Sequence, residues 1–135
     1  MNIDATNLIL GRVASFAAKK ALLGETINIV NCEKAVITGY KKALLIEFKR
    51  KRERGIPSKG PFYPRSPEKI VKRTIRGMLP YKQEKGKKAF KRIRCYVGVP
   101  ENIKNTETIK IADINKLPTL KYLKLEEISK YLGKK

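Results

Sequence analysis

The hydrophobic positions of the first forty residues predict strand and helix in alternation. Residues 1–4 and 27–31 are short runs, apolar or β-branched, of the kind that form strands. Between them, five apolar residues recur at helical spacing: Leu10, Val13, Ala14, Ala17 and Ala21. Gly24 follows where a helix commonly ends. Strand, helix and strand at this spacing predict a βαβ unit with parallel pairing.

One more short strand and two more helices are predicted outside this unit. Residues 35–37 form an apolar run that Thr38 and Gly39 end, which predicts a strand. A helix is predicted from residue 40 onward, with an inner face of Tyr40, Ala43, Leu44 and Phe48. A last helix is predicted to end at Gly133 and to bury Leu125, Ile128, Tyr131 and Leu132.

The most clearly marked helix is predicted at residues 69–80. Ser66 is placed to cap it, Pro67 stands at its first position, and Pro80 prevents its continuation. Its predicted buried face consists of Ile70, Val71, Thr74, Ile75 and Met78. The other faces carry an outward basic ridge of Lys69, Lys72, Arg73 and Arg76. Gly77 is interpreted as a site of close approach.

Irregular chain is predicted on both sides of this helix. Residues 56–66 contain three prolines and a glycine, a composition typical of an ordered loop, and residues 81–88 predict a flexible hydrophilic connection. A short helix is predicted from Ala89, Phe90 and Ile93, followed by a strand at residues 94–97. Residues 109–111 alternate like an exposed strand or extended segment.

Net charge changes this picture more than any single motif. The 135 residues include 32 Lys and Arg against 12 Asp and Glu, a net charge of +20. Residues 41–94 alone hold 20 basic and four acidic residues, a net +16. Such a charge opposes folding by self-repulsion, so it indicates a polyanionic partner, with nucleic acid favoured over membrane or acidic protein. Solubility is the alternative explanation, but it needs a net charge of only about 2–8.

The residue types that most enzymes and metal sites require are scarce. The sequence has no histidine and two cysteines, Cys32 and Cys95, which argues against a zinc site and against a His-activated nucleophile. Both cysteines are interpreted as small core residues, and a disulfide between them stays open. Carboxylates are scattered, and residues 86–88 lack the rest of a phosphate-binding loop. We therefore expect no enzyme, no metal and no cofactor.

The candidate RNA-binding residues are cations of the middle segment. Five of the six residues 49–54 are basic, which exceeds what a helix C-terminus needs, so this helix end is predicted to project towards phosphates. A merely solvated face is the alternative. The predicted phosphate contacts are Lys49, Arg50, Arg52, Arg54, Lys59, Arg65, Lys72, Arg73, Arg76, Lys82, Lys87 and Lys88.

Two aromatic residues, Phe62 and Tyr63, lie beside cations in the predicted loop. Aromatic rings in such surroundings can stack on unpaired bases. The alternative, which we favour for two residues alone, is that both rings hold the loop against the rest of the domain.

No apolar run in the sequence approaches the roughly 20 residues of a membrane helix. The first residues also lack the pattern of a signal peptide. We therefore expect an intracellular protein without a membrane partner or a small-molecule substrate.

Several stretches resemble one known family. Arg73-Thr74-Ile75-Arg76-Gly77-Met78-Leu79-Pro80 is similar to the signature of the universal large-subunit ribosomal protein L-thirteen family. Residues 4–6 and 10–15 resemble the family's opening, residues 30–39 its second strand and turn, and residues 94–98 the segment after the signature. Residues 62–67 and 122–133 resemble the archaeal and eukaryotic branch, and the absence of histidine after Gly98 departs from the common bacterial pattern.

The resemblance implies an α/β protein, with a three-layer α/β/α single domain around a small, mainly parallel four-stranded sheet and basic helical and loop extensions. It implies a structural constituent of the large ribosomal subunit in the cytoplasm, bound to large-subunit rRNA and to neighbouring ribosomal proteins, without catalytic activity. Residues 1–40 and 89–100 would form the core, 41–88 the rRNA-facing part, and 101–135 a C-terminal extension. A free RNA-binding regulator of mRNA translation is the alternative, because it needs the same basic face.

Overall fold

The computed structural model describes residues 1–133 and has an α/β fold, as predicted. Strands β1 (Asn2–Asp4), β2 (Ile27–Val30) and β4 (Ile93–Cys95) form a parallel sheet with β2 in the middle. Ile3 pairs with Ile29, and Ile29 pairs with Cys95, so the side chains of the three strands line up in rows. The predicted βαβ unit of β1, α1 (Leu10–Leu22) and β2 is confirmed.

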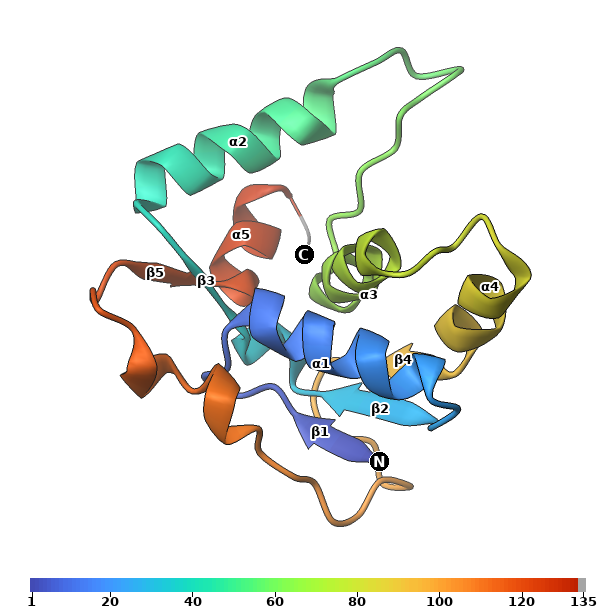
Figure 1. Cartoon of the computed structure of the whole chain (residues 1–135). Helices are drawn as coiled ribbons and strands as arrows, with labels where there is room; N and C mark the ends of the chain where they lie inside the picture. Colours follow the sequence, from blue (N-terminus) through green and yellow to red (C-terminus); the bar gives the residue numbers. More distant parts are fainter. Residues whose placement is uncertain (134–135) are drawn as a thin grey trace.

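Helices α1, α3 (Pro67–Met78) and α4 (Glu84–Lys91) pack together on one side of this sheet (Figure 1). All five residues of the predicted apolar stripe on α1 are buried. Three of these are alanines, whose small side chains allow α3 to approach α1 closely. No helix within residues 1–133 is long and apolar enough to cross a membrane.

The burial of α3 follows the prediction at most positions. Ile70, Val71 and Ile75 are buried, and Thr74 is half-buried. The prediction is wrong for Met78, which is 44% exposed, because the helix ends there and the next residue, Leu79, turns into the core instead. Ser66 stands at the N-cap, but its side chain makes no capping hydrogen bond in the described structure.

The two faces of the parallel sheet differ in polarity because successive residues of a strand point to opposite faces. Ile27 and Ile29 are fully buried on one face. On the other face, Asn28 Nδ2 donates to Asn2 Oδ1 at 2.9 Å, and Asn2 Nδ2 donates to the carbonyl of Lys104 at 3.1 Å. This face therefore carries polar contacts to the irregular chain around Lys104, whereas the opposite face is apolar.

Strand β3 (Val36–Thr38) does not join the parallel sheet. It pairs in antiparallel fashion with β5 (Tyr122–Lys124), so the parallel sheet has three strands where four were predicted. The physical reason lies just after β2, where Asn31 adopts the left-handed conformation with φ 53° and a 3₁₀ helix, η1 (Cys32–Lys34), follows. This turn directs β3 away from the sheet edge.

Residues 101–124 wrap along the core. The amide of Glu107 donates to the carbonyl of Asn2 at 2.8 Å, and the amide of Ile9 donates to the carbonyl of Ala112 at 2.7 Å. Two 3₁₀ helices, η2 (Lys110–Ala112) and η3 (Ile114–Lys116), occur in this segment. Of the exposed strand or extended segment expected at residues 109–111, Ile109 is extended, but it is buried, and the 3₁₀ helix begins at the next residue.

The C-terminal helix, α5 (Leu125–Tyr131), is one residue shorter than its predicted apolar stripe. Leu125, Ile128 and Leu132 are buried as predicted. Tyr131 is exposed instead, because it faces a hollow beside α2 (Lys41–Glu53). Gly133 adopts a positive φ of 89°, as expected of a residue that ends a helix.

Helix α2 extends above the rest of the molecule (Figure 1). Phe48 is buried and Leu44 half-buried, but Tyr40 and Ala43 are exposed, so half of the predicted inner face is wrong. The helix packs by a narrow stripe only. Tyr40 precedes the helix, and its hydroxyl accepts a hydrogen bond from Lys121 Nζ at 2.9 Å.

The segment predicted to be flexible at residues 81–88 includes the first turns of α4. Ile93 belongs to β4 and not to the predicted short helix, and this strand begins and ends earlier than predicted. A Cβ added to Gly86 would lie 2.0 Å from the carbonyl oxygen of Pro80, so the close approach occurs at Gly86. Nothing lies within 4 Å of the corresponding position at Gly77, where we expected it.

The two glycines therefore predict opposite effects of an added methyl group. Gly86→Ala is expected to lower the free energy of unfolding by about 1–3 kcal/mol, because the Cβ clashes with backbone atoms. Gly77→Ala, the matched control in open space on a helix, is expected to raise it by about 0.5–1 kcal/mol. Urea denaturation of the free protein measures both changes, and equal effects would contradict the assigned close approach.

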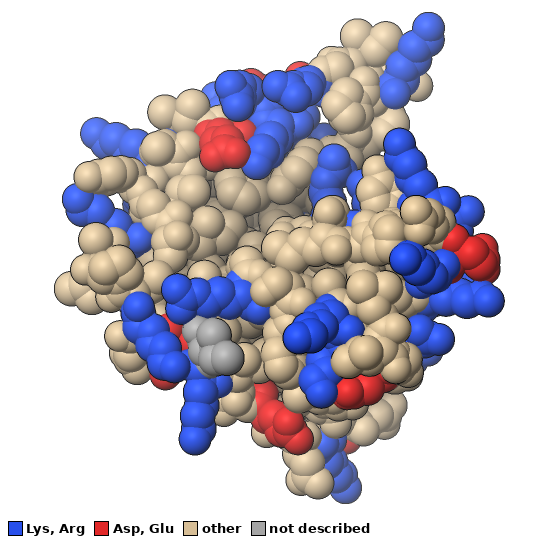
Figure 2. Space-filling model, in the orientation of Figure 1, with Lys and Arg blue, Asp and Glu red and all other residues tan. Residues whose placement is uncertain are grey.

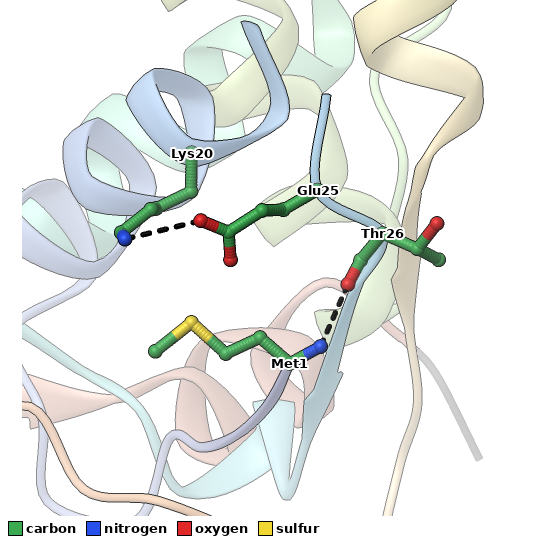
Figure 3. Close-up of polar contacts among 4 residues, drawn as sticks. All are labelled: Met1, Lys20, Glu25 and Thr26. Carbon is green, nitrogen blue, oxygen red and sulfur yellow. Dashed lines mark hydrogen bonds and ion pairs between the residues drawn. The ribbon is translucent and has the colours of Figure 1, made fainter. Parts of the chain in front are cut away.

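Two polar contacts surround the turn between α1 and β2 (Figure 3). The terminal ammonium of Met1 donates to the carbonyl of Thr26 at 2.9 Å, and Lys20 Nζ lies 3.1 Å from Glu25 Oε1. The ion pair is partly exposed and contributes little to stability. The first residues are therefore held mainly by the backbone pairing of β1 with β2.

The carboxylate of Asp4 holds the turn after β1. Its Oδ1 accepts from the amide of Thr6 at 2.9 Å, from Thr6 Oγ1 at 2.6 Å and from Asn31 Nδ2 at 3.1 Å. Partial burial by itself raises the pKa of Asp4, but the hydrogen bonds from Thr6 and Asn31 lower it to a net value below the ordinary one.

Because the folded protein lowers the pKa of Asp4, the contribution of Asp4 to the free energy of unfolding decreases in acid. The contribution is fully present above the unfolded-state pKa of 3.8 and is lost as the pH falls through the lower folded-state pKa. Asp4→Asn is expected to cost about 1 kcal/mol at pH 7, allowing for solvent screening. Urea melts from pH 7 to pH 2.5 should show this difference vanish in acid, and a constant difference would contradict the role of Asp4.

Cys32 and Cys95 are both free thiols within the described structure. Cys32 is fully buried and Cys95 half-buried, in agreement with their interpretation as small core residues. A hydrogen bond with Cys95, and then burial, raise the pKa of Cys32 far above its ordinary value. Cys32 is therefore a neutral thiol at physiological pH.

Candidate nucleic-acid interface

The candidate cations lie on three helices, α2, α3 and α4, and on the chain between them. Figure 2 shows lysine and arginine side chains along the top, where α2 and the following loop lie, and down the right side near α4. Basic side chains also reach the other edges of this view, and acidic ones are fewer. No group of three metal-ligating side chains occurs within residues 1–133.

The predicted basic ridge of α3 is held by aromatic rings. Three of its cations are half-buried, and each lies over a ring, at these distances from the ring centroid: Lys72 over Phe90 at 5.1 Å, Arg73 over Tyr63 at 4.8 Å and Arg76 over Tyr81 at 5.3 Å. Cation–π contacts of this kind restrict the side chains while the charges stay accessible. The ridge thus presents charges in defined positions.

A groove of about 400 Å³ separates α3 from the end of α2 and the loop. It brings Arg54 from the end of α2 to the same site as Arg73 of α3, across the intervening loop. Gly77 and Thr74 line the groove on the α3 side. Because Gly77 has no side chain and open space before it, a bulky partner can approach the helix backbone there.

Lys51 also lines this groove but is absent from the predicted contacts. Its Nζ lies 2.7 Å from Glu47 Oε1 and 5.2 Å from the ring centroid of Phe48. A hydrogen bond from Lys51 accordingly lowers the pKa of Glu47. The signal was available in the sequence, since Lys51 belongs to the basic run and stands one turn after Glu47 and Phe48.

Two further hollows gather candidate cations. One of about 640 Å³ lies between α2 and α5 and contains Lys49, Arg50 and Arg54. Another of about 290 Å³ lies along α3 and contains the ridge residues Lys69, Lys72, Arg73 and Arg76. Lys69 belongs to the predicted ridge but is not among the predicted phosphate contacts.

Arg52 is half-buried, as is Lys51 before it, whereas Lys49 and Arg50 are exposed. Its Nε is buried and lacks a hydrogen-bond partner among the described residues. Such a donor costs about 1–3 kcal/mol when it is left without an acceptor. An acceptor oxygen supplied by a partner would therefore stabilise this side chain.

Besides Arg52, five predicted contacts lie outside these hollows: Lys59, Arg65, Lys82, Lys87 and Lys88. All five are exposed. Lys88 has a distant i,i+4 pairing with Glu84 at 4.0 Å, which contributes little at an exposed site. The structure thus separates the predicted set into a clustered group on α2 and α3 and a scattered group.

The two aromatic residues of the loop have different surroundings. The ring of Tyr63 is half-buried, with its centroid 5.9 Å from that of Phe48 in an edge-on contact and with Arg73 over it. Burial raises the pKa of Tyr63. Phe62 is 65% exposed. The hypothesis that both rings hold the loop is confirmed for Tyr63 and is wrong for Phe62.

This contact predicts how the loop responds to mutation. Tyr63→Ala is expected to lower the free energy of unfolding by about 2 kcal/mol, half of the value for a fully buried ring. Without the ring, residues 56–62 are expected to lose their contact with the rest of the domain. Tyr63→Phe keeps the ring and is the matched control. Hydrogen exchange of the loop amides measures the release, and unchanged exchange in Tyr63→Ala would show that the ring does not hold the loop.

Fold and surface together define a class: a basic α/β protein whose cations gather around two helices. A family model described as ribosomal protein L13 matches residues 1–102. Similar proteins named large ribosomal subunit protein uL13 occur in several archaea. That of Methanosarcina barkeri is 52% identical over 98% of this chain and 97% of its own length. Those of Methanocaldococcus jannaschii and Thermoplasma volcanium are 49% and 41% identical, over 97% and 96% of their lengths.

The chain belongs to the ribosomal protein L13 family. The resemblance of its motifs to that family, and to the archaeal branch, is confirmed. Membership makes it a structural protein of the cytoplasmic ribosome and not an enzyme.

Proposed function

We propose that the protein is a structural constituent of the large ribosomal subunit that binds and stabilises large-subunit rRNA. Its mechanism is charge neutralisation, in which Lys and Arg screen phosphates so that separate RNA segments pack closely. Neighbouring ribosomal proteins are the other partners. The relatives named large ribosomal subunit protein uL13 support the assignment to this subunit.

The observation that carries the RNA-binding part is the placement of charge. A net +16 lies in residues 41–94, and its cations line three hollows around α2 and α3. Gly77, which lines the groove, has no atom within 4 Å of its Cβ position, so it leaves room for a partner beside α3. Cations held at fixed positions favour a partner whose charges are regularly spaced, as phosphates are.

Within this proposal the chain divides by role. Residues 1–40 and 89–100 supply the βα elements of the core, and residues 41–88 face the rRNA with their outer cations while α3 adds Ile70, Val71 and Ile75 to the core. Residues 101–135 are the C-terminal extension, of which the last two lie outside the described residues. Hydrogen bonds from Glu107 and Ile9 support a core role for this extension in addition.

Salt dependence tests the electrostatic mechanism. Binding to a large-subunit rRNA transcript should weaken with a log–log slope of about −0.7 to −0.9 for each phosphate neutralised. The double variant Arg50→Gln/Arg54→Gln removes two exposed cations of the α2 hollow, so it should reduce the slope by about 1.4–1.8. Filter binding between 50 and 200 mM salt, the range where such effects are large, measures the change.

The matched control is Lys110→Gln/Lys116→Gln, which removes two exposed cations outside residues 41–94. Its slope should remain that of the unmodified protein. A flat salt response, or equal slopes for the two double variants, would contradict the proposed interface. Sedimentation in high salt separates the structural role from a free mRNA regulator, because only a structural constituent stays with large subunits.

A further inference from the structure

Phe62 is an exposed aromatic side chain within the most basic part of the chain. It is 65% exposed, while its neighbour Tyr63 packs against Phe48 and Arg73. A single exposed apolar residue is ordinary on a protein surface and by itself indicates nothing. The position of the ring and its surroundings make Phe62 different.

The backbone around Phe62 is fixed at several points. The carbonyl of Phe62 accepts a hydrogen bond from Arg73 Nη1 at 3.2 Å. Before it, the amide of Gly60 donates to the carbonyl of Ile56 at 2.8 Å, and the amide of Ile56 donates back to Gly60 at 3.3 Å. Together with the buried ring of Tyr63, these contacts order the loop without a partner.

The ring of Phe62 is itself held on one side. A Cβ added to Gly60 would lie 3.0 Å from ring atoms of Phe62, so the ring lies against the Gly60 backbone. One side of the ring is therefore supported and the other is open to solvent. A side chain that is already ordered loses little conformational entropy when a partner binds, which favours affinity.

Phe62 forms part of a hollow of about 300 Å³ at the end of α2. Its walls include the apolar Ile56 and Pro61 and the cations Arg52 and Arg54. Glu53 also lines it and disfavours a phosphate directly beside its carboxylate. The hollow thus combines a flat apolar surface with two guanidinium groups and one acceptor.

We propose that this hollow binds one unpaired RNA base, stacked on Phe62, with Arg52 and Arg54 next to the phosphate or sugar of the same nucleotide. The carboxylate of Glu53 accepts a hydrogen bond from an amino group of the base or from a 2′-hydroxyl. Bases that are not paired are commonly recognised by such aromatic stacking with Arg nearby. This inference rests on the proposed rRNA binding and specifies one site within it.

The two cations favour a nucleotide over an apolar protein side chain as the occupant. Inserting an apolar side chain between Arg52 and Arg54 would remove water from two charges without pairing them, which is costly. A nucleotide supplies a phosphate for the charges and a π-face for the ring.

Two substitutions separate stacking from apolar contact. Phe62→Leu keeps an apolar side chain but removes the ring, and Phe62→Trp keeps a stacking surface. Affinity for a transcript of large-subunit rRNA from Methanosarcina barkeri is measured by filter binding at several salt concentrations. Phe62→Leu is expected to weaken binding about 5- to 100-fold with an unchanged salt slope, because base stacking is not electrostatic. Phe62→Trp is expected to bind as the unmodified protein does.

Hydrogen exchange of the backbone amides of residues 56–66 is the control, and it is expected to be the same in both variants and in the unmodified protein because the loop keeps its structure. Equal affinity of Phe62→Leu and the unmodified protein would overturn the stacking site while leaving rRNA binding intact. No binding of the unmodified protein at any salt concentration would overturn the proposed function and this site together. The two failures are therefore distinguishable.

A photoreactive residue tests the occupant inside the assembled particle. p-Benzoylphenylalanine in place of Phe62 is incorporated into large subunits and irradiated. A crosslink to an rRNA nucleotide, expected in an unpaired segment, supports the proposal. A crosslink only to a neighbouring protein overturns it and assigns Phe62 to a protein contact.

Discussion

Repulsion among cations is the constraint on which the rest of this structure depends. Residues 41–94 carry a net +16, yet α3 lies in the middle of that segment and contributes Ile70, Val71 and Ile75 to the core. The fold meets both demands by placing cations on the outer faces and rings beneath them. Lys72, Arg73 and Arg76 each lie over an aromatic ring, which offsets part of the repulsion and fixes where the charges point.

The two ends of the chain carry little net charge and supply the support for this basic surface. Strands β1 and β2 and helix α1 come from the first thirty residues, and β4 completes the parallel sheet from the other end of the basic segment. Residues 101–133 return to pair with β1 and β3. Because α3 packs on α1, a rigid core stands directly behind the basic ridge. Helix α2 has only a narrow apolar stripe around Phe48, so its many cations extend from the core into the space that the proposed rRNA would occupy.

Much of the helical structure and the family could be predicted from sequence. Periodicity identified α1, α3 and α5, because each buries apolar residues at a spacing of three to four. It did less well for α4, which begins in a hydrophilic run, buries only the small residues Gly86 and Ala89, and depends for its position on the contact of Gly86 with Pro80. The sequence therefore indicated a close backbone approach at Gly77, which lies in the family-like motif, whereas the structure has it at Gly86.

By itself, the sequence determined the family, the location of the charge and most of the core faces of α1, α3 and α5, since these depend on motifs, composition and local spacing. Only the tertiary structure decided which residues meet. A left-handed turn at Asn31 sends β3 to β5 instead of the parallel sheet, and the loop brings Arg54 to Arg73. The same packing buries Tyr63 and exposes Phe62, although the two are adjacent in sequence, because contacts with Phe48 and Arg73 are non-local.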